Sequence, residues 1–229
     1  MDDLTVVLVS PRNPLNIGAC ARAMSNFGFH DLRLVNPYEK AFREAVSAVG
    51  GAPVLQSARV YDDLAAAVND CSLVVGTTSI GNRELQHTLY PLESAAPLIQ
   101  GKAALLFGSE KFGLSNDDIS FCHFLVRIPT TPETPSMNLG QSVAVCLYEL
   151  IRNPSARAVT ESRRSLSGND AEQITRMLLE VLHRSGYTNR IVATSTELKI
   201  RRFIRRIHLG AVDGRLVLGF LRQLLWKLR

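Results

Sequence analysis

Short runs of apolar and β-branched residues recur through the first 150 residues of this 229-residue chain, with helical stretches between them. The clearest run is Leu4–Val9, which ends at the turn signal Ser10-Pro11. Other runs occupy residues 32–35, 72–76, 103–107 and 124–128. Near-continuous apolar strands that alternate with helices predict an α/β fold, with a parallel sheet covered by helices on both faces. Ligands of such sheets bind at the carboxyl ends of strands. The loops of interest follow Val9, Val75, Phe107 and Ile128.

The segments between these runs predict the helices that would cover the sheet. We expect helices over residues 17–27, 41–49, 61–68 and 139–151, and a weak strand at 54–56. The helix over 139–151 is the most apolar of them.

The charge of the chain is divided unevenly along its length. Residues 1–150 hold 10 Lys and Arg against 15 Asp and Glu, whereas residues 151–229 hold 16 against 6. From residue 169 onward the second part also shows helical spacing. We therefore expect one domain at 1–155, a linker at 156–168 and a basic helical extension at 169–229. This excess of positive charge favours a polyanionic partner, either nucleic acid or an anionic membrane surface.

Several classes of protein lack their sequence signals here. Residues 108–113 have the G-x-x-x-x-G spacing of a P-loop, but Leu114-Ser115 stands where that loop needs Lys and Ser or Thr. No G-x-G-x-x-G of a dinucleotide-binding domain follows the first strand. The cysteines are scattered and the histidines isolated, so we expect no metal site and a reduced, cytoplasmic protein. No apolar run approaches the roughly 18 residues of a membrane span, and we expect no signal peptide.

Three polar segments have patterns that favour a ligand site. Residues 13–22 place small residues at the start of a helix, which permits close approach of another backbone. Residues 108–113 form a loop directly after a strand, and residues 128–138 hold three prolines that stiffen a polar loop. Ser136 or Asn138 can cap the helix that follows. Helix-terminal N–H groups suit a polar ligand, although a plain proline-rich connection would show the same pattern.

Together these segments resemble the three motifs of the TrmH/SpoU branch of the SPOUT methyltransferases. The matching stretches are Asn16-Ile17-Gly18-Ala19-x-Ala21-Arg22, Leu106-Phe107-Gly108-Ser109-Glu110-x-x-Gly113-Leu114, and Ile128-Pro129 with Ser136-Met137-Asn138-Leu139. Residues 22–28 and Leu34-Val35-Asn36-Pro37 are most similar to the TrmJ type, which modifies tRNA. The basic helical C-terminus resembles the TrmJ extension, so the resemblance covers nearly the whole chain.

This resemblance implies the SPOUT fold, whose deep C-terminal trefoil knot would involve the loops after Phe107 and Ile128, although knots are rare in general. It also implies that S-adenosylmethionine is the cofactor, bound bent in the knot. The protein would be a homodimer with its site at the interface. The residues expected to bind the cofactor are Thr77, Thr78, Ser79, Gly108, Glu110, Ile128, Pro135, Ser136 and Met137.

The resemblance further implies that Arg22 is the catalytic residue, supported by Asn16, Ser136 and Asn138. The arginine of this family is proposed as a general base. Because a guanidinium pKa lies above about 12, we interpret Arg22 as a phosphate clamp and leave the base open. The reaction needs orientation and removal of the hydroxyl proton, and it needs no metal.

The implied function is methylation of a ribose 2′-hydroxyl of tRNA at position 32, where C or U stands first in the anticodon loop. The alternatives are the same reaction on ribosomal RNA and, from another class, a non-catalytic RNA-binding protein. In the helix near Ile200, an apolar face with Phe203, Ile204 and Ile207 would leave the cations on the opposite surface. The expected RNA-binding residues are Arg12, Arg22, Lys199, Arg201, Arg202, Arg205 and Arg206.

Overall fold

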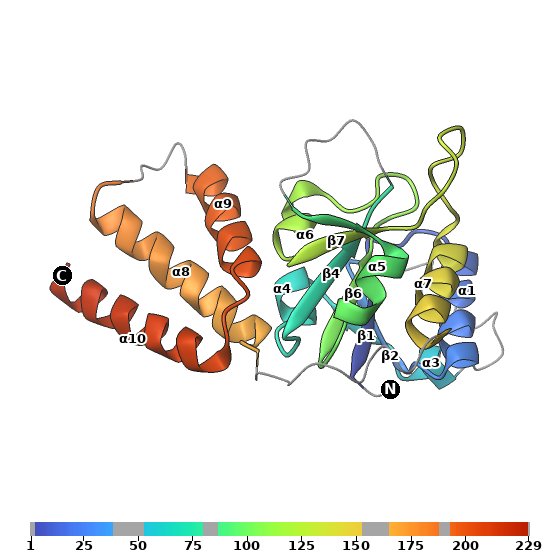
Figure 1. The fold of residues 1–229 in the computed structure, drawn as a ribbon, viewed down its shortest axis with the longest axis horizontal. Helices are drawn as coiled ribbons and strands as arrows, with labels where there is room; N and C mark the ends of the chain where they lie inside the picture. The colour runs from blue at the N-terminus through green and yellow to red at the C-terminus, as the bar shows by residue number, and fades with distance from the viewer. Residues whose placement is uncertain (1–2, 39–52, 80–86, 153–164, 188–192, 229) are drawn as a thin grey trace.

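The computed structural model describes residues 3–38, 53–79, 87–152, 165–187 and 193–228. Figure 1 shows a sheet with helices on both sides and, next to it, a smaller helical C-terminal unit. Within these ranges no helix has both the length and the apolar character needed to cross a membrane.

Seven strands form one sheet in which all neighbouring strands are parallel. Their order across the sheet is β3-β2-β1-β6-β4-β7-β5. The strands are β1 (Leu4–Val9), β2 (Asp31–Val35), β3 (Arg59–Tyr61), β4 (Leu73–Thr77), β5 (Leu89–Pro91), β6 (Ala103–Phe107) and β7 (Phe124–Arg127). The sheet confirms the predicted α/β class. Because β4 lies between β6 and β7, three loops that are distant in sequence leave the sheet side by side.

Side chains of the central strands alternate between two apolar cores, one on each face of the sheet. In β1, Val6 and Leu8 belong to one core, and Val7 and Val9 belong to the other. The first core is covered by α1 (Pro14–Phe27), α3 (Pro53–Gln56), α5 (Leu92–Ala95) and α7 (Leu139–Arg152). The second is covered by α4 (Leu64–Ala67) and α6 (Asn116–Ser120). Burial on both faces explains why the strands show continuous apolar runs.

Helices α1 and α7 pack closely because small residues meet at their contact. A Cβ atom added to Gly140 would lie 2.6 Å from the Cβ of Ala19, closer than real Cβ contacts allow. The small residues at the start of α1 therefore permit a close approach, as predicted. The helix begins after Asn13, whose side chain accepts a hydrogen bond from the Leu15 N–H, and ends at Gly28 with φ of 77°.

Some local predictions differ from the structure. Residues 54–56, expected as a weak strand, lie in α3, where Pro53 takes the first helical position that favours proline. Strands β3 and β5 were not predicted, because three residues are too few to show an alternation. The helix expected over 61–68 is reduced to α4, and the helix expected over 41–49 lies outside the described residues.

The C-terminal unit comprises α8 (Gly168–Arg184), α9 (Ala193–Arg206) and α10 (Ala211–Lys227), which pack around a core of their own. Leu166 belongs to this core together with Ile174, Ile204, Leu218 and Leu221. The last residues of the predicted linker therefore pack with the helices. The other domain boundaries stay a prediction.

The C-terminal unit also contacts the sheet domain directly. The N–H of Asn169 donates a hydrogen bond of 2.6 Å to the carbonyl of Asn69, beyond α4. A Cβ atom on Gly168 would lie 2.2 Å from the carbonyl oxygen of Val68, so only glycine fits at this contact. The start of α8 is thereby held against the loop that leads into β4.

Candidate active site

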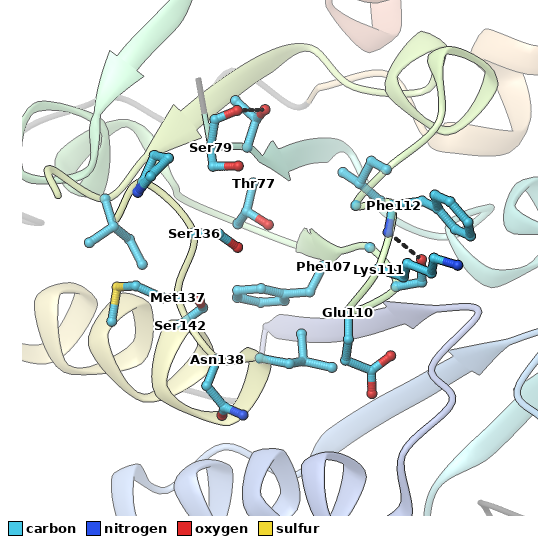
Figure 2. Close-up of a pocket in the computed structure, with 18 of the residues that line it drawn as sticks. Thr77, Ser79, Phe107, Glu110, Lys111, Phe112, Ser136, Met137, Asn138 and Ser142 are labelled. Carbon is cyan, nitrogen blue, oxygen red and sulfur yellow. Dashed lines mark hydrogen bonds between the residues drawn. The ribbon is translucent and has the colours of Figure 1, made fainter. Parts of the chain in front are cut away.

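A cavity of about 470 Å³ opens at the carboxyl edge of the sheet, where the loops after β4, β6 and β7 meet (Figure 2). Figure 2 shows Thr77, Phe107 and Ser136 around its centre, with Glu110 at one side. Every residue expected to bind a cofactor lines this cavity: Thr77, Thr78, Ser79, Gly108, Glu110, Ile128, Pro135, Ser136 and Met137. The structure thus brings the complete predicted set together.

Hydrogen bonds between neighbouring strand ends fix the floor of the cavity. The hydroxyl of Thr77 donates to the carbonyl of Leu106 in β6 at 2.8 Å. The N–H of Thr78 donates to the carbonyl of Val126 in β7 at 3.0 Å. The end of β4 is therefore tied to both neighbours, and the three loops start from a rigid base.

The loop after β6 folds back on itself beside the cavity. The N–H of Gly113 donates to the carbonyl of Ser109 at 2.8 Å, and Gly113 has φ of 67°. This turn brings the backbone against Gly108, where a Cβ atom would lie 2.0 Å from the carbonyl carbon of Gly113. Gly108 is therefore required by the loop itself, before any ligand is considered.

If the cavity binds S-adenosylmethionine, as the resemblance implies, a Gly108→Ala variant is expected to lose about a hundredfold or more of that affinity, because the added Cβ atom forces the loop apart. Isothermal titration calorimetry would measure the loss. The matched control is Gly113→Ala, which meets no atom within 4 Å and carries only the strain of its positive φ, about 1 kcal/mol. Equal affinity in Gly108→Ala and the unmodified chain would contradict this assignment.

The loop after β7 leads into α7 through a side-chain cap. The Asn138 carbonyl oxygen Oδ1 accepts hydrogen bonds from the N–H groups of Gly140 at 2.9 Å and Gln141 at 3.3 Å. Of the two candidate caps in the sequence, Asn138 is therefore the one used. Ser136 lines the cavity, and the hydroxyl of Thr130 donates to the carbonyl of Pro135 at 3.1 Å across the loop.

A chain of hydrogen bonds joins all three sequence motifs at one wall of the cavity. Asn138 Nδ2 donates to Asn16 Oδ1 at 2.9 Å, and Asn16 Nδ2 donates to Glu110 Oε1 at 3.0 Å. The Glu110 carboxylate also accepts from the backbone N–H groups of Arg12 and Asn13, each at 3.1 Å. Asn16, Glu110 and Asn138 therefore each form a hydrogen bond to a motif other than their own, which holds the three motifs together.

The electrostatics of Glu110 agree with this role. Burial alone would raise its pKa, but the hydrogen bonds from Asn16 and from the backbone N–H groups outweigh burial, so the pKa lies below its ordinary value. The carboxylate stays ionised at neutral pH. Its contribution to the wall is lost only as the pH falls through this lowered pKa.

Arg22 is the expected catalytic residue that the structure leaves outside the cavity. It is exposed on α1, six residues after Asn16, which is about 9 Å further along the helix. It does not line the cavity of its own chain. Arg12 is also exposed, and its backbone N–H contacts Glu110.

The residues that line the cavity but were not among those expected to bind the cofactor include Phe107, Leu139 and Ser142. Ser142 lies one turn after Asn138 on α7, so helical spacing from the cap could have identified it. Phe107 and Leu139 read as ordinary core residues in sequence, and both are also buried in the first core.

The prediction that Arg201 lies on an exposed, RNA-facing surface is wrong. It is 6% exposed and its Nη2 lies 3.1 Å from Glu172 Oε1 in α8 and 2.7 Å from Glu197 Oε1. Its Nη1 donates to Ser120 Oγ of α6 at 3.3 Å, and its guanidinium lies 4.4 Å from the Phe121 ring centroid. Arg201 therefore joins the C-terminal unit to the sheet domain.

The same correction applies to Arg205, which is 2% exposed and donates to the carbonyl of Gly168 at 3.4 Å. Burial lowers its pKa from the ordinary value. Arg202 is half-buried and donates to the carbonyl of Asn116 at 3.2 Å. Of the five cations predicted on α9, Lys199 and Arg206 are exposed. The helix turns Arg201 and Arg205 inward because α6 and α8 provide oxygen partners for them.

Among the described residues, no group of three or more His, Cys, Asp or Glu side chains is arranged to hold a metal ion.

The chain is similar in sequence to known RNA methyltransferases. The profile described as the SpoU rRNA Methylase family matches residues 3–148. The protein of Sodalis glossinidius named tRNA (cytidine/uridine-2′-O-)-methyltransferase TrmJ is 32% identical over 234 residues, covering 98% of this chain and 92% of that protein. The Pseudomonas aeruginosa protein named tRNA (cytidine/uridine/adenosine-2′-O-)-methyltransferase TrmJ is 40% identical over 156 residues, 66% of this chain and 61% of its own.

A solved structure is similar over nearly the whole length. The crystal structure of TrmJ from Z. mobilis ZM4 superimposes with a TM-score of 0.84 at 31% identity, covering 96% of this chain and 98% of that one. This similarity includes the C-terminal helices as well as the sheet domain.

Proposed function

The chain belongs to the SpoU rRNA methylase family, and from that premise we propose that it transfers a methyl group from S-adenosylmethionine to a ribose 2′-hydroxyl of tRNA. The observation that carries this proposal is the cavity in which all nine expected cofactor residues meet, backed by the chain Asn138–Asn16–Glu110. A tRNA substrate is favoured over ribosomal RNA because the relatives that match nearly the full chain are named for tRNA.

The cavity suits S-adenosylmethionine in size and lining. A volume of about 470 Å³ lies within the range of small-molecule pockets, about 300–1,000 Å³. Phe107, Val126 and Leu139 supply apolar surface for an adenine ring, while hydroxyls and main-chain groups of the three loops supply polar partners. When bound, the cofactor supplies a methyl group already activated on a sulfonium. The protein has to orient the ribose and accept its proton.

We propose that Arg22 acts in the cavity of a second subunit. Arg22 is exposed on α1 and lies outside its own cavity. Leu15 of α1 is 72% exposed and Tyr148 of α7 is 51% exposed, so this pair of helices offers apolar area for a partner. A homodimer through α1 and α7 would bring the arginine of one chain to the cofactor of the other. There its bidentate guanidinium would hold a tRNA phosphate and orient the adjoining ribose.

We also propose the trefoil knot, formed by the loops that line the cavity. Its support is the family membership and the position of β4 between β6 and β7. A cytoplasmic location is proposed as well, and it is supported by the free, buried state of Cys20, Cys71, Cys122 and Cys146.

Position 32 of the anticodon loop, with C or U, remains the proposed target. Mapping 2′-O-methyl marks in RNA from a deletion strain, before and after adding the purified protein, would test it. Loss and recovery of a mark at tRNA position 32 is expected. A mark lost from ribosomal RNA instead would favour the competing substrate. A folded chain that binds no S-adenosylmethionine in calorimetry would favour a non-catalytic RNA-binding protein.

The exposed cations of α9 are expected to contact tRNA phosphates. A Lys199→Ala, Arg206→Ala double variant should reduce the slope of log affinity against log salt by roughly 1 to 2, because each lost phosphate contact contributes about 0.9. Filter binding at several salt concentrations measures the slope. The methylated nucleotide should be unchanged, since phosphate contacts carry no sequence information. An unaltered slope would place the RNA mainly on the sheet domain.

A further inference from the structure

Helix α10 has an apolar face that its own core does not cover. Leu218 and Leu221 are buried in the core of the C-terminal unit, and Gly214 contacts Leu166. On other sides of the same helix, Leu216 is 57% exposed, Phe220 is 59% exposed and Leu224 is 48% exposed. Exposed large apolar residues gathered on one helix favour a protein contact.

The exposed residues form one continuous face. At 3.6 residues per turn, residues seven apart lie almost in line, so Asp213, Phe220 and Lys227 share the centre of the face. Leu216 and Leu224 lie one turn before and one turn after Phe220. Beside Phe220, Gly219 has open space, since an added Cβ atom would meet nothing within 4 Å.

This face is complementary to itself when two copies run antiparallel. With Phe220 on the two-fold axis, Leu216 lies opposite Leu224 of the partner subunit. Asp213 lies opposite Lys227 of the partner subunit, which gives an ion pair on each side of the axis. The structure gives neither Asp213 nor Lys227 a salt bridge within the ranges it describes. The ring of Phe220 would rest over the open backbone of Gly219.

We propose that the face of Asp213, Leu216, Phe220, Leu224 and Lys227 binds the same face of a second copy of this chain. A second copy is favoured over RNA because the carboxylate of Asp213 on the central line would repel phosphate groups, whereas Lys227 of a second copy would pair with it. The contact is small, so it forms weakly and depends on protein concentration.

The proposed contact is separate from the dimer through α1 and α7. Figure 1 shows α10 at the end of the molecule opposite to those two helices. An isologous contact at each end links dimers to one another, so the assembly grows beyond two chains. The proposal does not rest on the enzymatic function.

Sedimentation equilibrium over a range of concentrations tests the proposal. The full chain is expected to exceed the mass of a dimer at high concentration, and Phe220→Asp is expected to stop at the dimer. The matched control is Phe203→Asp, which changes the same kind of side chain, 45% exposed, on α9; it should associate like the unmodified chain. If the α1–α7 dimer does not exist, the unmodified protein should have the mass of a dimer, and Phe220→Asp should have the mass of a monomer.

A charge exchange tests the antiparallel register. Asp213→Lys and Lys227→Asp should each weaken the association at least about threefold, because each places like charges opposite one another. The double variant Asp213→Lys, Lys227→Asp should recover to within about twofold. The proposal is overturned if the unmodified chain and Phe220→Asp have the same measured mass at every concentration. So does a double variant as weak as the single ones. Loss of tRNA affinity in Phe220→Asp without a change of mass would show that the face binds RNA instead.

Discussion

The Arg22→Ala variant is expected to bind S-adenosylmethionine normally and to lose about 10²–10⁴-fold in the rate of methyl transfer. The physical reason is position: Arg22 lies outside the cavity of its own chain, so its removal leaves the cofactor loops intact. Calorimetry measures cofactor affinity, and transfer of a labelled methyl group to tRNA measures the rate. A suitable control is Arg176→Ala, which removes an exposed arginine from α8. Turnover by Arg22→Ala at the unmodified rate would contradict the assignment.

Arg22→Lys separates two roles of the arginine. Lysine keeps the positive charge but loses the bidentate geometry of guanidinium. If Arg22 is a phosphate clamp, the lysine variant should recover part of the rate and show a raised KM for tRNA. If instead the group loses a proton during the reaction, lysine, with its lower ordinary pKa of about 10.4, should change the pH profile of kcat.

Mixing two inactive variants tests whether the site spans two subunits. In a dimer of one Arg22→Ala chain and one Gly108→Ala chain, a shared site leaves one cavity with both an intact loop and an intact arginine. Random exchange of subunits should then restore about a quarter of the unmodified activity, since half the dimers are mixed and each has one intact site of two. A site contained within one chain restores none.

The Arg201→Leu variant is expected to destabilise the C-terminal unit by about 3–5 kcal/mol, because it leaves Glu172 buried without its partner. The side chains of Arg201 and Glu172 are 8% and 10% exposed, so water cannot replace the lost contact. Thermal unfolding followed by circular dichroism should show a melting temperature lowered by roughly 10 °C, and limited proteolysis should cut α8–α10 faster. Lys199→Ala, an exposed change on the same helix, should leave both readouts unchanged.

A second substitution distinguishes an ion pair from simple packing. Adding Glu172→Leu to Arg201→Leu removes both charges and should recover most of the lost stability. If the double variant is as unstable as Arg201→Leu alone, the arginine acts through its other contacts, with Ser120 and the Phe121 ring. If Arg201→Leu is as stable as the unmodified chain, the side chain does not hold the unit in solution.

The parallel sheet and the cofactor cavity could be predicted from the sequence. Strands buried on both faces show continuous apolar runs, and parallel strands place their following loops at one edge. All nine residues that the family resemblance implied line one cavity. Six of them stand at or near the ends of β4, β6 and β7, whereas Pro135, Ser136 and Met137 lie at the far end of the loop after β7, just before α7. The Asn138 cap is also local, since a helix must satisfy its first N–H groups near its own start.

Tertiary structure decided what depends on partners distant in sequence. The order β3-β2-β1-β6-β4-β7-β5 follows from packing of whole layers, and the edge strands β3 and β5 exist because neighbours offer them hydrogen bonds. Glu110 was expected to bind the cofactor, and only the structure shows that its carboxylate also holds Asn16 and the backbone of Arg12 and Asn13.

Helix α9 shows most clearly where the sequence stops being decisive. Its spacing fits an apolar face that includes Phe203 and Ile207, yet these are 45% and 43% exposed while Arg201 and Arg205 are buried. Spacing reports which residues share a face, but it does not report which face a neighbouring element covers. Burial of an arginine depends on an acceptor that only the folded chain supplies, and here Glu172 stands 29 residues away.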